Sequence, residues 1–507
     1  MEFQYSSTSS SAAITILSTF CFLSSILILL LLRHQTKNDN NRKHKFPPGS
    51  RGWPVIGDSF SWYNAVAGSH PPAFVERQVS RFGKIFSCSL FGRWAVVSAD
   101  PGFNRLVLLN EGRLFKSSYP KSFRDLVGEN GIVIAQGEQQ RKLHGIASSM
   151  MRVEKKKLDS VLLEEIQSVV IRTLGRLVEG PVVCLQDVCR KVAMNAVAIN
   201  LMVNQLFGIS TEEEVNEMAE LFSVFVDGCL SVPVNIPGFA YHSGMKAREK
   251  ITSKINTIVE KSREAKRENE SETGTGLLGR VLKEGSIEDD AISDFIINLL
   301  FAGNETTAKT MVVAVYFLSR CPKAMQQLLE EHDGLRSNEM LTWEDYKAMP
   351  FTQCVIDETL RIGGIAIWLF REAIEDVAYE DYIIPKGCLV VPFLAAVHLD
   401  ENLYEGAVNF NPWRWMDPQN QDKRNWRSSP CFTPFGGGAR FCPGAELARL
   451  QIALFLHYFV TTYRWTQVKE DRMSFFPSAR LVNGFQIRLS RRRQQEEEES
   501  KLDSQPY

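Results

Sequence analysis

The sequence lacks a charge imbalance: 58 lysines and arginines stand against 59 aspartates and glutamates, giving a formal net charge of −1. A nearly neutral chain has no overall field to attract nucleic acid, so we do not expect nucleic-acid binding. None of its ten cysteines forms a C-x-x-C pair, and a chain of 507 residues needs no disulfide framework. We therefore expect the cysteines to be reduced structural thiols in a protein that faces the cytosol. One of the ten is expected to have a different role.

The sequence also lacks internal repeats and a glycine-rich βαβ unit for nucleotide binding. Helical periodicity recurs in long segments, at 155–177, 211–226, 246–268, 289–318 and 342–362. Short β-branched runs predict strands at 85–90, 95–98, 382–384 and 388–391. We therefore predict one mainly α domain with small β-sheets over residues 47–491, although length alone would suggest about three domains.

Charge is absent from residues 12–32, an apolar run that contains neither proline nor glycine. As a helix rising about 1.5 Å per residue, this run just spans the ~30 Å hydrocarbon core of a bilayer. A cleaved signal peptide is the alternative, but the run exceeds a typical signal sequence and no basic residue precedes it. We predict a transmembrane anchor at 12–32, preceded by a short lumenal N-terminus at 1–11.

Basic residues follow the apolar run, at Arg33, Lys37, Arg42, Lys43 and Lys45. The positive-inside rule then places the rest of the chain in the cytosol. With one span and no retention tetrapeptide, we expect a single-pass protein of the endoplasmic reticulum membrane. Residues 33–46 are predicted to be a basic linker that enters a proline-rich hinge, and residues 492–507 a charged disordered tail.

The most informative local pattern is Phe435-Gly-Gly-Gly-Ala-Arg-Phe-Cys442-Pro-Gly444. Its glycines, Gly436 among them, let the backbone approach a flat ligand closely. A helix is predicted over 445–460, so Cys442 lies just before a helix N-terminus, where free amides and the dipole favour a thiolate. A thiolate there can bind iron, and Arg440 is suited to pair with a carboxylate of the same cofactor.

On the full F-x-x-G-x-R-x-C-x-G pattern, the chain resembles the cytochrome P450 superfamily over roughly residues 46–491. The resemblance implies the cytochrome P450 fold and a haem b held by Cys442 as axial and metal ligand, with Phe435 and Gly436 beside it. It also implies a monooxygenase that uses O2 and electrons from a separate NADPH-cytochrome P450 reductase. Some basic residues before the loop belong either to the reductase docking face or to a solvated loop: Lys423, Arg424 and Arg427.

A polar group interrupts the apolar helix 289–318, in the run 301–307 (FAGNETT). Threonine can bond back to helix carbonyls, and the resemblance identifies an oxygen-binding kink here. It makes Glu305 and Thr306 catalytic residues that deliver protons to dioxygen at the haem. A haem-thiolate isomerase or dehydratase acting on peroxides would tend to lose this acid–alcohol pair. A non-catalytic steroid-binding protein, the other alternative, would have no use for a thiolate.

The resemblance gives roles to further charged residues. Glu358 and Arg361, by themselves a common surface pair, become a buried structural triad with Arg414 that supports the haem pocket. Arg371 and Arg440 become the cations that hold the haem propionates.

The segment around residues 140–144 departs from the family pattern. Relatives carry a Trp or His four residues before an Arg, where this chain has Gln140 and His144. Arg141 and Lys142 are candidates to supply the missing propionate contact, and His144 would serve if protonated.

The predicted substrate pocket is apolar, which suits a bulky hydrophobic substrate, and residues 117–128 are expected to form a lid over it. Its candidate wall residues are Ala302, Ile365, Ile367, Trp368 and Leu481.

Within the superfamily the chain most resembles plant steroid hydroxylases of brassinosteroid biosynthesis. The segments that carry this resemblance are 52–57, 352–356, 397–400 and 411–415. The resemblance implies hydroxylation of a sterol side chain at carbon 22 or 23. Residues 363–368 depart from those enzymes, so the hydroxylation of another plant triterpenoid, steroidal or terpenoid hormone precursor is the alternative.

Overall fold

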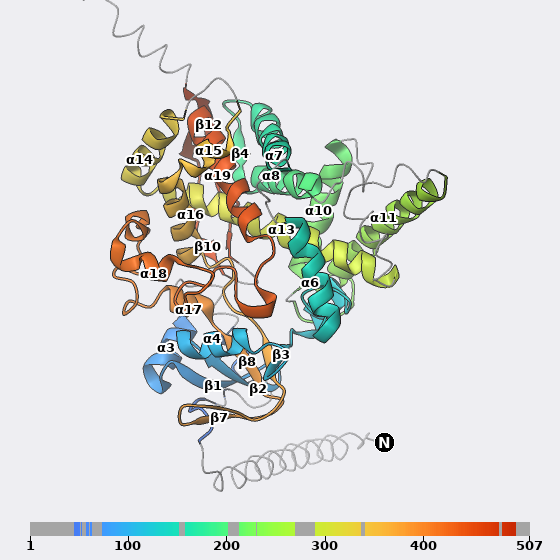
Figure 1. Cartoon of the computed structure of the whole chain (residues 1–507), viewed down its shortest axis with the longest axis vertical. Coiled ribbons are helices and arrows are strands. Elements are labelled where there is room, and N and C mark those ends of the chain that lie inside the picture. Colours follow the sequence, from blue (N-terminus) through green and yellow to red (C-terminus); the bar gives the residue numbers. More distant parts are fainter. Residues whose placement is uncertain are drawn as a thin grey trace, which may run out of the picture.

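A helical body carries a five-stranded β-sheet at one end, as the computed structural model shows in Figure 1. The structure describes residues 45–50, 52, 57–59, 61–62, 73–151, 158–200, 212–229, 231–268, 289–335, 340–475 and 479–492. The predicted anchor and most of the linker and tail lie outside these residues. Within the described ranges, no helix has both the length and the apolar character that crossing a bilayer requires.

Residues that flank the predicted domain on both sides contact the body of the protein. Lys45 and Phe46 were expected in the linker, but the Lys45 carbonyl accepts from the Ile383 amide at 3.2 Å, and the Phe46 ring contacts Trp94. At the other end, Arg492 was expected in the tail, yet its Nε donates to the Val460 carbonyl at 2.6 Å.

The five-stranded sheet has the order β1-β2-β8-β5-β3. Its strands are β1 (Ile85–Leu90), β2 (Arg93–Ser98), β3 (Phe115–Ser117), β5 (Arg371–Ala373) and β8 (Leu389–Pro392). β2 and β8 pair in parallel, whereas the other neighbours are antiparallel. This sheet puts Arg371 opposite Ser117, which later matters for the site.

Among the described residues, three smaller sheets add to the β structure. They are β4 (Val182–Cys184), β12 (Gln486–Arg491) and β9 (Tyr463–Gln467); β10 (Met473–Ser474) and β11 (Arg480–Leu481); and β6 (Val377–Tyr379) and β7 (Tyr382–Ile384). The predicted strands at 85–90 and 382–384 coincide with β1 and β7, and the one at 388–391 is shifted by one residue.

Most of the body is helical. The helices are α3 (Ala73–Phe82), α4 (Pro101–Leu109), α5 (Lys121–Val127), α6 (Gly137–Met151), α7 (Leu158–Gly175), α8 (Leu185–Asn200), α10 (Glu212–Cys229), α11 (Ala240–Glu268), α13 (Asp289–Leu318), α14 (Pro322–Asp333), α15 (Trp343–Lys347), α16 (Pro350–Ile362), α17 (Leu394–His398), α18 (Gln421–Arg424) and α19 (Ala445–Thr462). Three short 3-10 helices are η2 (Pro412–Trp415), η3 (Pro418–Asn420) and η4 (Gly438–Arg440).

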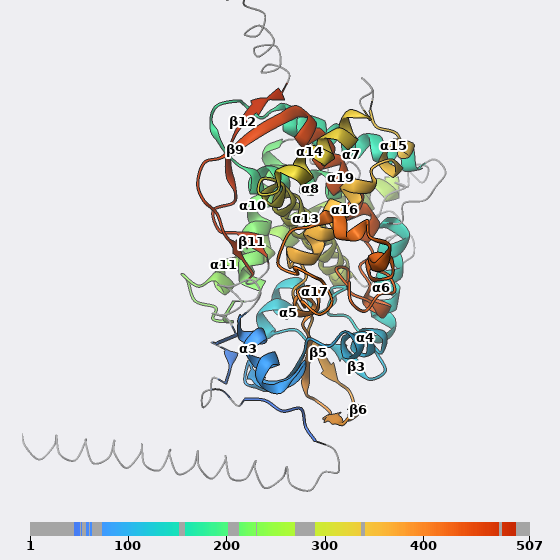
Figure 2. The same cartoon turned by 90° about the vertical axis from the view of Figure 1, so that its left-hand side faces the viewer.

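Helix α13 runs through the middle of the body, beside α8, α16 and α19, in both Figure 1 and Figure 2. It and its neighbours bury one large apolar cluster that includes Met311, Val355 and Leu454. The site described below is built on one face of α13 and on the loop that leads into α19.

One prediction about the helices was wrong. The segment 342–362 was expected to be one helix, but it forms α15 and α16, because Pro350 has no N–H for a continuing helix and begins a new one. Helix α13 is helical at every position from Asp289 to Leu318, including the segment 301–307 where a kink was predicted. The nine cysteines in the described ranges are all free thiols.

Candidate functional site

The loop before α19 is closed by its own backbone. The Cys442 amide donates to the Phe435 carbonyl at 3.0 Å, and α19 begins at Ala445. Gly438 has a φ of +64°, and a Cβ there would lie 2.0 Å from the Leu108 carbonyl oxygen of α4. Only glycine fits this close approach, so the glycine run of the loop serves its packing on α4.

The loop alone does not ionise the Cys442 thiol. Burial raises its pKa to about 11, while a hydrogen bond from the Gly444 backbone lowers it. The helix terminus was expected to favour the thiolate, but desolvation outweighs the nearby amide. A bound cation would reverse this balance, because a metal-coordinated thiol is deprotonated.

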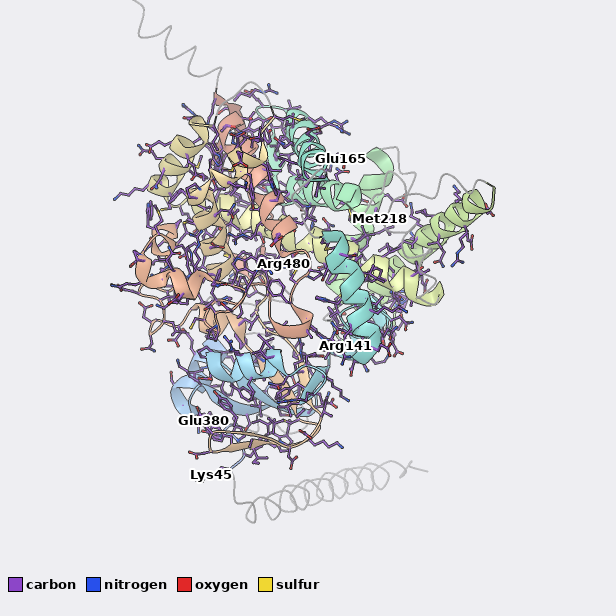
Figure 3. All side chains as sticks on the ribbon, viewed as in Figure 1. Lys45, Arg141, Glu165, Met218, Glu380 and Arg480 are labelled. Atoms are coloured by element: carbon purple, nitrogen blue, oxygen red, sulfur yellow. The ribbon has the colours of Figure 1, made fainter. Side chains whose placement is uncertain are left out.

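Helix α6 holds the same loop through its backbone. Gln140 donates to the Ala439 carbonyl at 3.0 Å, and His144 Nε2 lies 2.7 Å from the Phe441 carbonyl. Since a carbonyl only accepts, Nε2 donates to Phe441, and Nδ1 lies 3.3 Å from the Ser148 hydroxyl. Arg141, predicted as a propionate contact, is exposed on α6 (Figure 3), so the side chains facing the loop are Gln140 and His144.

Two buried arginines share one carboxylate. Arg371 of β5 and Arg440 of η4 each place Nε 2.7 Å from a different oxygen of Glu111. Their side chains are 3% and 10% exposed, so the pair carries an uncompensated positive charge away from water. A buried net cation favours an anionic ligand. Glu111 was not foreseen from the sequence.

One face of α13 is open in the middle of an otherwise buried stretch. Ala302 and Thr306, one turn apart, are exposed, whereas Asn304 and Glu305 between them are buried. The Thr306 hydroxyl donates to the Ala302 carbonyl at 2.6 Å. Its oxygen lone pairs therefore remain available on the open face.

Glu305 does not share the open face with Thr306. Its carboxylate is only 4% exposed and lies 3.0 Å from Lys309 Nζ and 3.2 Å from Arg190 Nε of α8. Burial raises the pKa of Glu305, but the Lys309 and Arg190 charges outweigh it and hold the pKa below its usual value. Glu305 is therefore an ionised anchor between α8 and α13 in this structure.

The structure brings Glu358, Arg361 and Arg414 together. Glu358 Oε1 lies 2.7 Å from Arg361 Nη2 and 3.0 Å from Arg414 Nε, and the two Glu358 and Arg361 side chains have no exposed surface. Arg361 also donates to the His398 and Ala407 carbonyls at 2.6 and 2.7 Å. Every charged group here is paired and hydrogen-bonded, as a buried ionic network requires.

The predicted pocket wall is only partly supported. Ala302 is exposed and Ile365 partly exposed, but Ile367, Trp368 and Leu481 are packed in the protein core at 4%, 8% and 1% exposure. Trp368 contacts the rings of Trp62, Phe370 and Phe393. Trp368 belongs to the buried apolar cluster on the sheet that includes Phe86 and Val97.

Sequence reasoning missed a line of aromatic rings beside Ala302. Tyr119 and Phe123, at the start of the predicted lid, stack at 4.6 Å, and Phe123 contacts Phe301 at 6.3 Å. Phe301 in turn contacts Phe225 of α10 at 5.7 Å, and Tyr119 contacts Phe370. These rings come from four separate segments, so no local pattern revealed them.

The three basic residues before the cysteine loop are engaged within the chain. Arg424 binds the buried Asp357 at 2.8 Å, and Lys423 donates to the Leu403 carbonyl at 2.9 Å. Arg427 pairs with Glu446 and is 53% exposed. Of the three, Arg427 alone leaves about half of its side chain accessible to a docking partner.

Taken together, these residues fit a haem. The loop supplies one thiol, Arg371 and Arg440 supply a buried excess of positive charge for its carboxylates, and Ala302 and Thr306 face the open side of α13. Among the described residues, no group of three or more His, Cys, Asp or Glu side chains could hold a metal ion.

Comparisons with known proteins agree with this chemistry. The family model described as Cytochrome P450 matches residues 47–485. The chain is 43% identical to an abietadienol/abietadienal oxidase of Pinus taeda, over 90% of this chain and 93% of that protein. It is 38% identical to a steroid (22S)-hydroxylase of Oryza sativa subsp. indica, over 92% of each. A retinoic acid-bound cyanobacterial CYP120A1 structure matches with a TM-score of 0.76 at 25% identity, over 89% of this chain and all of that one.

Proposed function

Because this chain belongs to the cytochrome P450 family, we propose that it hydroxylates the side chain of a steroid-like substrate at carbon 22 or 23, in plant brassinosteroid biosynthesis. The chain is a monooxygenase with a haem and an axial cysteine thiolate, as its family and fold imply. The proposal of a steroid substrate rests on the 38% identity to a steroid (22S)-hydroxylase across nearly the whole of both proteins.

The proposed haem site uses the residues already described. When bound, the thiolate-ligated haem supplies the activation of O2 for insertion into a C–H bond. Cys442 would give the thiolate, while Phe435 and Gly436 of the same loop would lie beside the cofactor. Arg371 would pair with its carboxylates, Arg440 would add buried positive charge beside them, and Gln140 and His144 fix the loop that carries the cysteine.

The proposed proton handling centres on Thr306. Its hydroxyl is held by the Ala302 carbonyl, so the oxygen accepts a hydrogen bond from water on the open face of α13. To donate in turn, the hydroxyl must release the Ala302 carbonyl. Glu305 reaches this relay only if its contacts with Lys309 and Arg190 are broken.

The enzyme acts at a membrane and receives its electrons from a separate reductase, in our proposal. The apolar run 12–32, with basic residues after it, supports a single-pass anchor in the endoplasmic reticulum membrane and a cytosolic catalytic domain. Large exposed apolar side chains between α10 and α11, Val232, Ile236 and Phe239, add an apolar surface that suits contact with lipid. The absence of a nucleotide-binding unit from the sequence supports a partner such as NADPH-cytochrome P450 reductase.

A second candidate is the oxidation of another terpenoid. It is favoured by the 43% identity to the abietadienol/abietadienal oxidase, which exceeds the identity to the steroid hydroxylase. Both candidates use the same haem site and differ only in the substrate.

The two candidates are separated by turnover in microsomes that contain the full chain and a plant reductase. A panel of plant sterols and abietadienol is supplied with NADPH, and mass spectrometry locates the added oxygen. We expect sterol products hydroxylated at carbon 22 or 23. Turnover of abietadienol with no sterol product would replace the steroid proposal with the terpenoid one.

Replacement of the proposed ligand tests the haem assignment in the same preparation. Cys442→Ser is expected to abolish turnover and the red-shifted Soret band of the reduced, CO-bound protein, because serine does not provide a thiolate. Cys431→Ser, a partly buried thiol eleven positions earlier, is the matched control and is expected to keep both. A normal CO spectrum in Cys442→Ser would contradict the assignment.

A further inference from the structure

We propose that Glu111 is a positioning residue for the haem, which orients Arg371 and Arg440 and through them lowers the reduction potential of the iron. The inference rests on the proposed function only in that these two arginines face the haem carboxylates. Glu111 itself is not proposed to contact the cofactor.

The carboxylate of Glu111 bridges the two guanidinium groups. One oxygen lies 2.7 Å from Arg371 Nε and the other 2.7 Å from Arg440 Nε. The three side chains are 6%, 3% and 10% exposed, so water screens their charges weakly. A single acid thus fixes the distance between a strand of the sheet and the cysteine loop.

A tight turn fixes Glu111 in turn. The Asn110 carbonyl accepts from the amides of Leu114 and Phe115, and Gly112 adopts a φ of +79°, which a side chain would strain. The Ser117 amide donates to Glu111 Oε1 at 3.2 Å. The carboxylate is therefore held by backbone on one side and by two cations on the other.

The two arginines are not equally available to a ligand. Arg440 is committed to the chain, because Nη1 and Nη2 donate to the Val133 and Ala135 carbonyls at 2.9 and 2.6 Å. Arg371 Nη1 donates to its neighbour Phe370, and no described residue engages Arg371 Nη2. Because Nε of Arg371 faces Glu111, Nη2 is the nitrogen that can donate a hydrogen bond to an anion.

The charge balance gives the sign of the effect. Two guanidinium groups and one carboxylate leave one net positive charge opposite the two haem carboxylates. Reduction adds an electron to the haem, so a nearby negative charge disfavours it. Loss of the Glu111 charge should therefore make reduction easier and raise the potential.

The test is a potentiometric titration of the purified, haem-loaded full chain with dithionite as reductant. Glu111→Gln keeps the size of the side chain and removes its charge, and we expect a potential shifted to more positive values. Glu372→Gln is the matched control: it makes the same charge change on the residue after Arg371, where Glu372 binds the half-exposed Arg93 and Lys116, and no comparable shift is expected. A shift in Glu111→Gln no larger than in the control, or toward negative values, overturns the inference.

Glu111→Asp covers the case in which Glu111→Gln fails to load haem. Aspartate keeps the charge on a shorter side chain, so it should restore haem loading with a potential close to that of the wild type. Failure of Glu111→Asp as well, in a protein that still folds, would mean that shape and not charge is required, and it overturns the inference.

Two further variants separate this inference from the proposed haem site. Arg371→Leu and Arg440→Leu should speed the transfer of haem to apomyoglobin. If they do, while Glu111→Gln leaves the potential unchanged, only the role of Glu111 is wrong. If neither changes haem transfer, the arginines do not hold the cofactor, and both assignments fall.

Discussion

At the scale of single residues, the contrast between Glu305 and Thr306 has the largest consequence for catalysis. Thr306 lies on the open face of α13, whereas Glu305 binds Lys309 and Arg190 within the body of the protein. A buried carboxylate is stable there only while its cations remain. Glu305 therefore contributes first to the packing of α8 on α13.

Lys309→Met tests whether the ion pair of Glu305 stabilises the fold. Removing one partner of a buried ion pair costs about 3 kcal/mol, and more if Arg190 does not compensate. A lower melting temperature of the haem-loaded protein would show this loss. Lys347→Met, which breaks an exposed pair with Glu344, is the control and should cost below about 0.5 kcal/mol.

The loss of stability in Lys309→Met should depend on pH. In the wild type the lowered pKa of Glu305 means that its contribution is present above the unfolded pKa of about 4.3 and is lost as the pH falls through the folded value. In Lys309→Met, burial should raise that pKa, so the two proteins should differ most near neutral pH and least near pH about 4. An equal difference at both pH values would contradict the role of the Glu305 charge.

Single residues were predictable where a contiguous motif carries them. The loop 435–444 and the pair Glu358–Arg361 lie within short stretches, and the structure brings their members together. The partners of Glu305 and of Arg371 were not predictable, because Arg190 and Glu111 lie 115 and 260 positions away. Only tertiary folding creates those contacts.

At the scale of elements, α5 is fastened to α11 and α13. Arg248 of α11 binds Asp294 of α13 at 2.6 Å and donates to the Leu126 carbonyl of α5 at 2.7 Å. Asn298 donates to the Val127 carbonyl at 2.6 Å. A Cβ at Gly128 would lie 2.2 Å from the Asp294 side chain, so glycine is needed where α5 ends.

Arg248→Met should loosen α5. It removes two hydrogen bonds and leaves the largely buried Asp294 without this cation, so local opening should become easier. Hydrogen exchange of the amides in 121–131 is expected to quicken. Lys254→Met on the same helix, which breaks an exposed pair with Glu217, should leave this segment unchanged. Unaltered exchange in Arg248→Met would show that α5 is held by apolar packing instead.

Elements were predictable in proportion to their length and periodicity. The helix at 289–318 coincides with α13, and α19 extends the expected 445–460 by two residues. Helix α5 was expected only as a lid loop, because Pro120 and Gly128 bound a segment too short for helical periodicity to be visible. Its helical form depends on the contacts that fasten it.

At the scale of the whole molecule, Glu358 connects distant parts of the body. Through Arg361 it reaches the His398 and Ala407 carbonyls, and through Arg414 it reaches η2 and the Glu405 carbonyl. The Asn411 amide also donates to Glu358 at 3.0 Å. One buried acid thus holds two cations and the segment 398–414 against α16.

Glu358→Gln should destabilise the entire fold, since it leaves two buried guanidinium groups sharing a neutral partner. We expect a loss of about 3–5 kcal/mol and a lower yield of haem-loaded protein. Glu344→Gln, at an exposed position of α15, is the control for the same chemical change. A melting temperature equal to that of the wild type would exclude the network as a determinant of stability.

The pairing of β2 with β8 and the position of Cys442 together constrain how the protein is made. Val97 pairs with Val391, and Cys442 follows 51 residues later. A ribosome must therefore synthesise the chain as far as Val391 before β2 can pair with β8, and as far as Cys442 before the thiol ligand exists. Haem capture at Cys442 therefore follows the synthesis of every strand of the central sheet.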